Sequence, residues 1–160
     1  MLALRGKTVD PLTYLEQIVV PTIAEFEKYP YSRRHAFIAC LVTFHTVNYI
    51  EYPKNAGNSR NKFRKESEAF AIVDRVAHAF KHVKSGHEND KHNRPLSVEH
   101  VYSHPPALAG VAQCGISLCG DVTGGVVLWG EDNADLLAIV KEAAEFLRTK
   151  CSAARAKRGK

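Results

Sequence analysis

The sequence predicts a mainly α protein, an antiparallel helical bundle of about four helices with a small β-hairpin inserted before the last helix. Two observations predict this fold class. Apolar residues recur every three or four positions in the first half of the chain and again near its C-terminus, as on the buried side of amphipathic helices. Between these regions lie short runs of β-branched and aromatic residues, separated by proline and glycine. Amphipathic helices must bury their apolar stripes, and a bundle does this most simply.

Two helices are predicted at the start of the chain. Asp10 and the proline after it suit the N-cap and first position of a helix over residues 11–28. Pro21 should kink or divide this helix, because proline cannot donate the main-chain hydrogen bond of a helix interior. Ser32 can cap a second helix, which ends at about Tyr52. That helix is apolar on two sides, which indicates a central, buried position.

A third helix and a strand region follow. Residues 55–61 contain glycine and asparagine and are predicted to form a loop, and residues 62–85 are predicted to form a long helix that Gly86 ends. Beyond it, strands are predicted at residues 98–102, 111–118 and 126–129. The last two of these are expected to pair as a hairpin across the glycine-containing residues between them.

The C-terminal part is predicted to form a closing helix and a tail. Asp132 or Asn133 can cap the helix. From Arg148 onward the chain carries six basic residues and no acidic one. Such a segment can hold phosphate, or it can be a frayed and solvated terminus. We assign residues 1–150 to one helical-bundle domain and residues 151–160 to a basic, disordered tail.

Composition excludes several classes of protein. No run approaches the roughly 18 apolar residues that a membrane span needs, and the N-terminus lacks the apolar run of a secretory signal. We therefore expect a cytoplasmic protein without a membrane partner. Cys114 and Cys119 are five positions apart, which is the wrong spacing for a zinc knuckle. We expect no metal and no cofactor.

The most unusual chemistry lies in the predicted third helix. Arg75, His78 and His82 are spaced by three and four positions, so they share one helix face. Asp74 precedes His78 by four positions, and a carboxylate there raises the pKa of the imidazole and orients its ring. We select Arg75, His78 and His82 as candidate catalytic residues. The candidate binding residues are Lys81, Lys84 and, on the second helix, His45.

Three interpretations of this helix compete. Paired histidines four positions apart can bind a metal, but no glutamate stands beside the first one and no third ligand is evident. The cationic row can instead bind phosphate or RNA, with a histidine acting as general acid or base. In the third interpretation the helix simply has a polar face, and its histidines make ordinary hydrogen bonds within the bundle.

The spacing of Arg75 and His82 resembles the motif of the HEPN superfamily, in which an arginine and a polar residue precede a histidine by a few positions. The resemblance covers residues 10–85 and the last helix, and the sequence Lys81-His82-Val83 is similar to part of the third helix in some bacterial members. HEPN domains are compact helical bundles, many of them linked to toxin–antitoxin and phage-defence systems, and catalytic members are metal-independent RNases. Val76 departs from the motif, because catalytic members usually have Asn, Asp or His there.

The resemblance implies a protein that contacts nucleotide or RNA and that is a metal-independent RNase if it is catalytic. Arg75 would hold the phosphate. His82, at the edge of the apolar stripe, would be partly buried, so that its pKa is lowered and the neutral ring can accept a proton. The alternative is a non-catalytic, antitoxin-like protein that forms a homodimer or binds a partner protein. A metal-dependent hydrolase is the third class.

Overall fold

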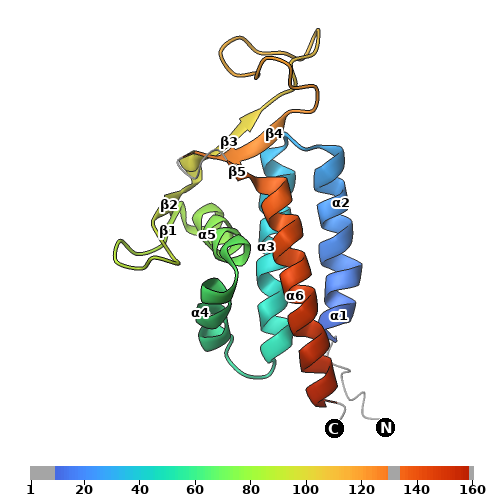
Figure 1. The fold of residues 1–160 in the computed structure, drawn as a ribbon, viewed down its shortest axis with the longest axis vertical. Coiled ribbons are helices and arrows are strands. Elements are labelled where there is room, and N and C mark those ends of the chain that lie inside the picture. Colours follow the sequence, from blue (N-terminus) through green and yellow to red (C-terminus); the bar gives the residue numbers. More distant parts are fainter. Residues whose placement is uncertain (1–9, 130–133, 159–160) are drawn as a thin grey trace, which may run out of the picture.

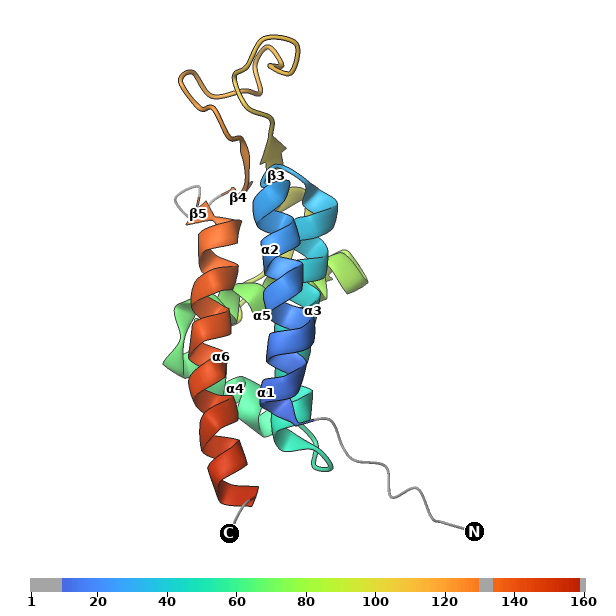
Figure 2. The ribbon, with the colours of Figure 1, turned by 90° about the vertical axis from the view of Figure 1, so that its right-hand side faces the viewer.

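The computed structural model describes residues 10–129 and 134–158, and most of them are helical (Figure 1). The predicted mainly α class is confirmed. The helical elements are α1 (Pro11–Tyr14), the π-helical turn η1 (Leu15–Val19), α2 (Val20–Lys28), α3 (Arg33–Glu51), α4 (Gly57–Glu66), α5 (Glu68–His82), the 3₁₀ turn η2 (Val98–His100) and α6 (Leu136–Arg158). Helices α2, α3 and α6 lie lengthwise beside one another, and α3 and α6 run opposite to α2 (Figures 1 and 2).

The first helical stretch contains the irregularity that proline predicts. The Asp10 carboxylate caps α1 by accepting a hydrogen bond from the Thr13 N–H at 3.3 Å. Pro21 stands at the start of α2, and the turn before it is π-helical, with the Val20 N–H donating to the Leu15 carbonyl. The extra residue in this turn adapts the helix to the missing proline N–H, so the stretch is interrupted without ending.

The predicted third helix is in fact two helices. Ser67 separates α4 from α5, and its hydroxyl caps α5 by accepting from the Phe70 N–H at 3.1 Å. The loop predicted at residues 55–61 is wrong beyond residue 56, because α4 begins at Gly57. Helix α5 ends at His82 and not at Gly86, and the C-cap residue Val83 has a φ of 70°. A serine N-cap inside a helical pattern was the signal for this division.

Two small antiparallel sheets follow α5. Strand β1 (Lys84–Ser85) pairs with β2 (Leu96–Ser97), and β4 (Gly125–Leu128) pairs with both β3 (Val101–His104) and β5 (Ala134–Asp135). The prediction that residues 111–118 form the partner strand of this hairpin is wrong. Those residues turn locally, with the Ser117 N–H donating to the Gln113 carbonyl, and they project with the rest of the long loop beyond the helices (Figure 2).

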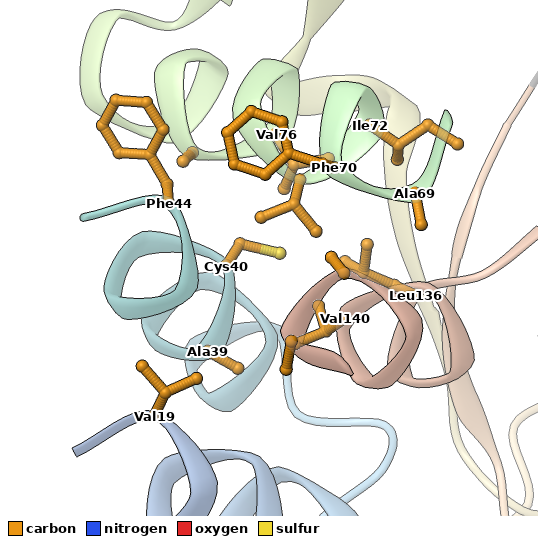
Figure 3. Packing of buried hydrophobic residues seen from close by; sticks show 14 of the residues in the cluster. Val19, Ala39, Cys40, Phe44, Ala69, Phe70, Ile72, Val76, Leu136 and Val140 are labelled. Atoms are coloured by element: carbon orange, nitrogen blue, oxygen red, sulfur yellow. The ribbon is translucent and has the colours of Figure 1, made fainter. Parts of the chain in front are cut away.

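Apolar side chains from all the long helices form the core (Figure 3). Cys40 is fully buried there. Within the described ranges, none of the helices has both the length and the apolarity needed to span a lipid bilayer.

Helix α6 continues through most of the predicted tail. The expectation of disorder from residue 151 is wrong for residues 151–158, which are helical. Cys151 explains the difference, because its side chain is fully buried in the core. Tertiary packing of this kind, more than helix propensity, stabilises helices in proteins. Residues 159–160 lie outside the described part of the chain.

Candidate functional site

Helices α3, α4 and α5 enclose a pocket of about 210 Å³, which we call the α3–α4–α5 pocket. Apart from one asparagine, its polar lining is cationic or titratable, and no acidic residue is found among the described residues that line it. Phe44 forms an apolar part of the wall. The polar side chains that line it are His45, Asn48, Arg60, His78 and Lys81.

His78 is oriented by the residue one turn before it. Its Nδ1 lies 2.8 Å from the Asp74 main-chain oxygen and 3.2 Å from the carboxylate Oδ1. Both oxygens only accept hydrogen bonds, so Nδ1 carries a proton and Nε2 is left for a ligand. The hydrogen bond to the Asp74 carboxylate raises the pKa of His78, against the lowering effect of burial. The ring also meets the edge of Phe44, with centroids 4.9 Å apart.

The Asp74 carboxylate is 1% exposed and is shared between two cations. Arg64 of α4 donates a hydrogen bond to Oδ2, on the side away from His78. Burial alone would raise the pKa of Asp74, but the hydrogen bonds from His78 and Arg64 outweigh it and the pKa is lowered. Asp74 therefore stays ionised and stabilises the protonated form of His78.

His45 has the opposite electrostatic environment. Burial lowers its pKa, and the positive charges of Lys81, Arg60 and His78 lower it further. Its Nδ1 lies 3.0 Å from the Asn48 side-chain amide, which fixes the ring. His45 is therefore neutral near pH 7, while the pKa of His78 is shifted towards the charged form.

Arg60 supplies a cation that has no counter-ion among the described residues. Its guanidinium lies over the Phe44 ring, 5.3 Å from the centroid. The buried Nε has no hydrogen-bond partner within the described part of the chain. Buried donors are normally paired, so this atom is an exception to the usual pattern. Lys81 likewise has no ion pair among residues 10–129 and 134–158, and the two cations line the same pocket.

The structure brings together three of the six residues that the sequence selects, namely His45, His78 and Lys81. Arg75 is 3% exposed, and its Nε donates to the Arg94 carbonyl at 2.9 Å, so it serves the loop between β1 and β2. Although Arg75 and His82 share a helix face by spacing, neither of them lines the pocket.

His82 and Lys84 also lie apart from the pocket. The expected partial burial of His82 is wrong: its side chain is exposed, with its ring centroid 6.3 Å from that of His78. Lys84 lies in β1 beside a separate hollow of about 570 Å³, which His87 and His100 also line.

Sequence analysis missed Arg60 and Asn48. Arg60 lies in the segment that glycine and asparagine mark as a loop, and a loop residue has no face that can be compared with α5. Asn48 follows His45 by three positions on α3, and this spacing was an available signal.

No group of three or more potential metal-binding side chains is found among the described residues. Comparison with known proteins gives no further guide, because no family model, curated protein or solved structure matches the chain.

Proposed function

We propose that this is a nucleotide- or RNA-binding protein whose α3–α4–α5 pocket holds a phosphate group, and that two histidines give it metal-independent RNase activity. One observation carries the proposal: two cations without counter-ions among the described residues face the same pocket as two histidines with opposite pKa shifts. Pairs of titratable groups whose pKa values are pushed apart are typical of acid–base catalysis. A pocket rich in cations is suited to an anion.

The chemistry follows from the protonation states. Arg60 and Lys81 would hold the phosphodiester. Neutral His45 would take the proton from the ribose 2′-hydroxyl, whose oxygen attacks phosphorus. The bond from phosphorus to the 5′-oxygen breaks, and protonated His78 gives its proton to that leaving oxygen. The products are a 2′,3′-cyclic phosphate and a 5′-hydroxyl, and both proton transfers use histidine side chains of the pocket.

This proposal keeps the HEPN resemblance and the antiparallel-bundle class, but it changes the residues that act. Arg60 replaces Arg75 as the phosphate ligand, and His78 with His45 replaces His82. The helical pairing of Asp74 with His78 supports the change, because it gives His78 a fixed ring and a stabilised charge.

The test compares histidine variants in an RNA-cleavage assay. We expect His78→Ala and His45→Ala each to lower the cleavage rate at least about a hundredfold, which is the usual contribution of a general acid or base. His82→Ala is the matched control on the same helix, and we expect it to leave the rate near that of the parent. Equal rates for all three variants and the parent would eliminate the catalytic proposal.

A second candidate function is supported by a different surface. Several apolar side chains near the long loop are exposed, among them Leu118 at 57%, Val122 at 66% and Trp129 at 69%. Exposed apolar groups of this kind are typical of protein interaction sites. A non-catalytic protein that forms a homodimer or binds an antitoxin-like partner would use them. Light scattering would show a stable oligomer, and RNA binding at low salt would be absent.

A further inference from the structure

A second hollow, of about 520 Å³, lies on the other flank of α4, where the end of α3 and the last turns of α6 meet it. We call it the lysine groove. Four lysines line it, against one acidic residue among the described lining residues. They are Lys54, Lys62, Lys150 and Lys157.

Two of the lysines already form ion pairs with Glu66. Lys150 pairs with Glu66 at 2.6 Å and lies over the Phe146 ring, 4.9 Å from its centroid. Lys62 lies 3.7 Å from the same carboxylate group. Lys54 and Lys157, by contrast, have no ion pair within the described ranges. These two ammonium groups are placed to meet an external anion.

One carboxylate against four ammonium groups leaves the lining of the groove with a net positive charge. Glu51 accepts a hydrogen bond from the Ser59 hydroxyl at 2.7 Å, which ties it to the start of α4. Tyr52 stands beside it at the rim of the groove with 59% of its surface exposed. A cationic groove with an exposed aromatic ring is how proteins commonly bind single-stranded nucleic acid, since each base stacks and each phosphate pairs with a cation.

Helix α4 connects the groove to the α3–α4–α5 pocket. Arg60 lines the pocket, whereas Ser59 and Lys62 on the same turn line the groove. A helix with its side chains is about 10 Å across, so a chain of a few nucleotides could reach from one hollow to the other. Lys65 adds further positive charge to α4.

We infer that the lysine groove is a second phosphate subsite, and that the ligand is a single-stranded nucleic acid that crosses α4 from the α3–α4–α5 pocket. One phosphate occupies the pocket, a neighbouring stretch of backbone follows Lys54 and Lys157, and a base stacks on Tyr52. This inference rests on the proposed function of the pocket for the position of the first phosphate. It adds the length and the strandedness of the ligand.

The test measures fluorescence anisotropy with a labelled uridine mononucleotide and a labelled 2′-O-methyluridine dodecamer, which lacks the attacking 2′-hydroxyl and is not cleaved. For Lys54→Gln/Lys157→Gln we expect dodecamer binding about tenfold weaker at 0.15 M salt and a salt slope smaller by about 1.4, the value for two lost phosphate contacts on a single strand. Mononucleotide binding should not change. For Tyr52→Leu we expect dodecamer binding at least about fivefold weaker through lost stacking.

The control is Lys28→Gln/Lys141→Gln, which removes the same charge at the opposite end of the molecule (Figure 1). It should leave both affinities near the parent's. Parent-like dodecamer binding by Lys54→Gln/Lys157→Gln would overturn the subsite, as would groove-dependent binding to anionic lipid vesicles in place of the dodecamer. A different result would separate the two proposals. If substitution of the groove lysines weakens dodecamer binding but substitution of Arg60 or Lys81 does not, the proposed function of the pocket is overturned and the groove remains a nucleic-acid site.

Discussion

At the scale of single residues, the two histidines of the pocket differ in pKa because their environments differ. His78 has a buried carboxylate one turn away, and His45 has three cationic groups around it, from α4 and α5. The same imidazole therefore has its pKa raised in one place and lowered in the other. The difference between the two pKa values depends on Asp74, and the hydrogen bond from Arg64 helps to keep that carboxylate ionised.

A proton NMR titration tests this assignment. We expect His78 to titrate above the usual histidine pKa of about 6.5 and His45 below it, with Asp74→Asn lowering the pKa of His78. Any cleavage activity should be bell-shaped in pH. It should be lost on the acid side as His45 becomes protonated and on the alkaline side as His78 loses its proton. Two histidines that titrate in the reverse order would contradict the assignment.

The same shifts fix the direction of two effects on stability. His78, with its raised pKa, contributes stability that is present below about pH 6.5 and is lost as the pH rises through its folded-state pKa. His45, with its lowered pKa, contributes stability that is present above about pH 6.5 and is lost as the pH falls through its folded-state pKa. The two contributions oppose each other around neutrality.

At the scale of elements, close main-chain contacts decide where helices and strands end. Helix α5 does not use Gly86 as its terminator, because that glycine is needed in the turn between β1 and β2. Its φ is +86°, and a Cβ atom there would lie 2.3 Å from the Arg94 carbonyl oxygen. Both features exclude a side chain, so the glycine belongs to the sheet and not to the helix.

Two glycine substitutions distinguish the cost of a left-handed backbone conformation from the cost of a steric clash with the neighbouring main chain. Gly110 has a φ of +80° and open space around it, so Gly110→Ala should cost only the left-handed strain of about 1 kcal/mol in free energy of unfolding. Gly86→Ala should cost clearly more, since the main chain at Arg94 must also move. Urea unfolding with matched slopes measures both values. If both variants lose the same free energy of unfolding, the main chain at Arg94 moves away from residue 86 at little cost.

At the scale of the whole molecule, the last helix joins the two ends of the structure. It begins beside β5, packs against α3 and α5, and ends where it helps to form the lysine groove (Figure 1). The buried side chain of Cys151 keeps this end in place. The basic C-terminal segment is thus part of the fold up to Arg158, and its lysines lie on a helix.

Adjacent substitutions test whether the end of α6 is packed. Cys151→Asp puts a carboxylate at a fully buried position, and we expect it to lower the free energy of unfolding by more than about 3 kcal/mol. Ser152→Asp places the same charge at the next, exposed position and should change stability by less than about 0.5 kcal/mol. A disordered tail would make the two variants equally stable in thermal unfolding.

The sequence by itself determined the local features of this protein. Helical periodicity and the caps at Asp10 and Ser32 place the first two helices, and the structure shows both capping hydrogen bonds. The contact between Asp74 and His78 also follows from a spacing of four positions. Such features depend on backbone geometry over one or two turns, which neighbouring residues specify completely.

Only the tertiary structure decided which residues meet. Arg60 reaches the same pocket as His45 and His78 because α4 separates from α5 at Ser67, and Arg75 leaves it for the carbonyl of Arg94. Strand β4 pairs with β3 across the long loop and not with residues 111–118. These outcomes depend on how helices cross and on which partner buries each apolar face, and a single sequence's periodicity carries no information about either.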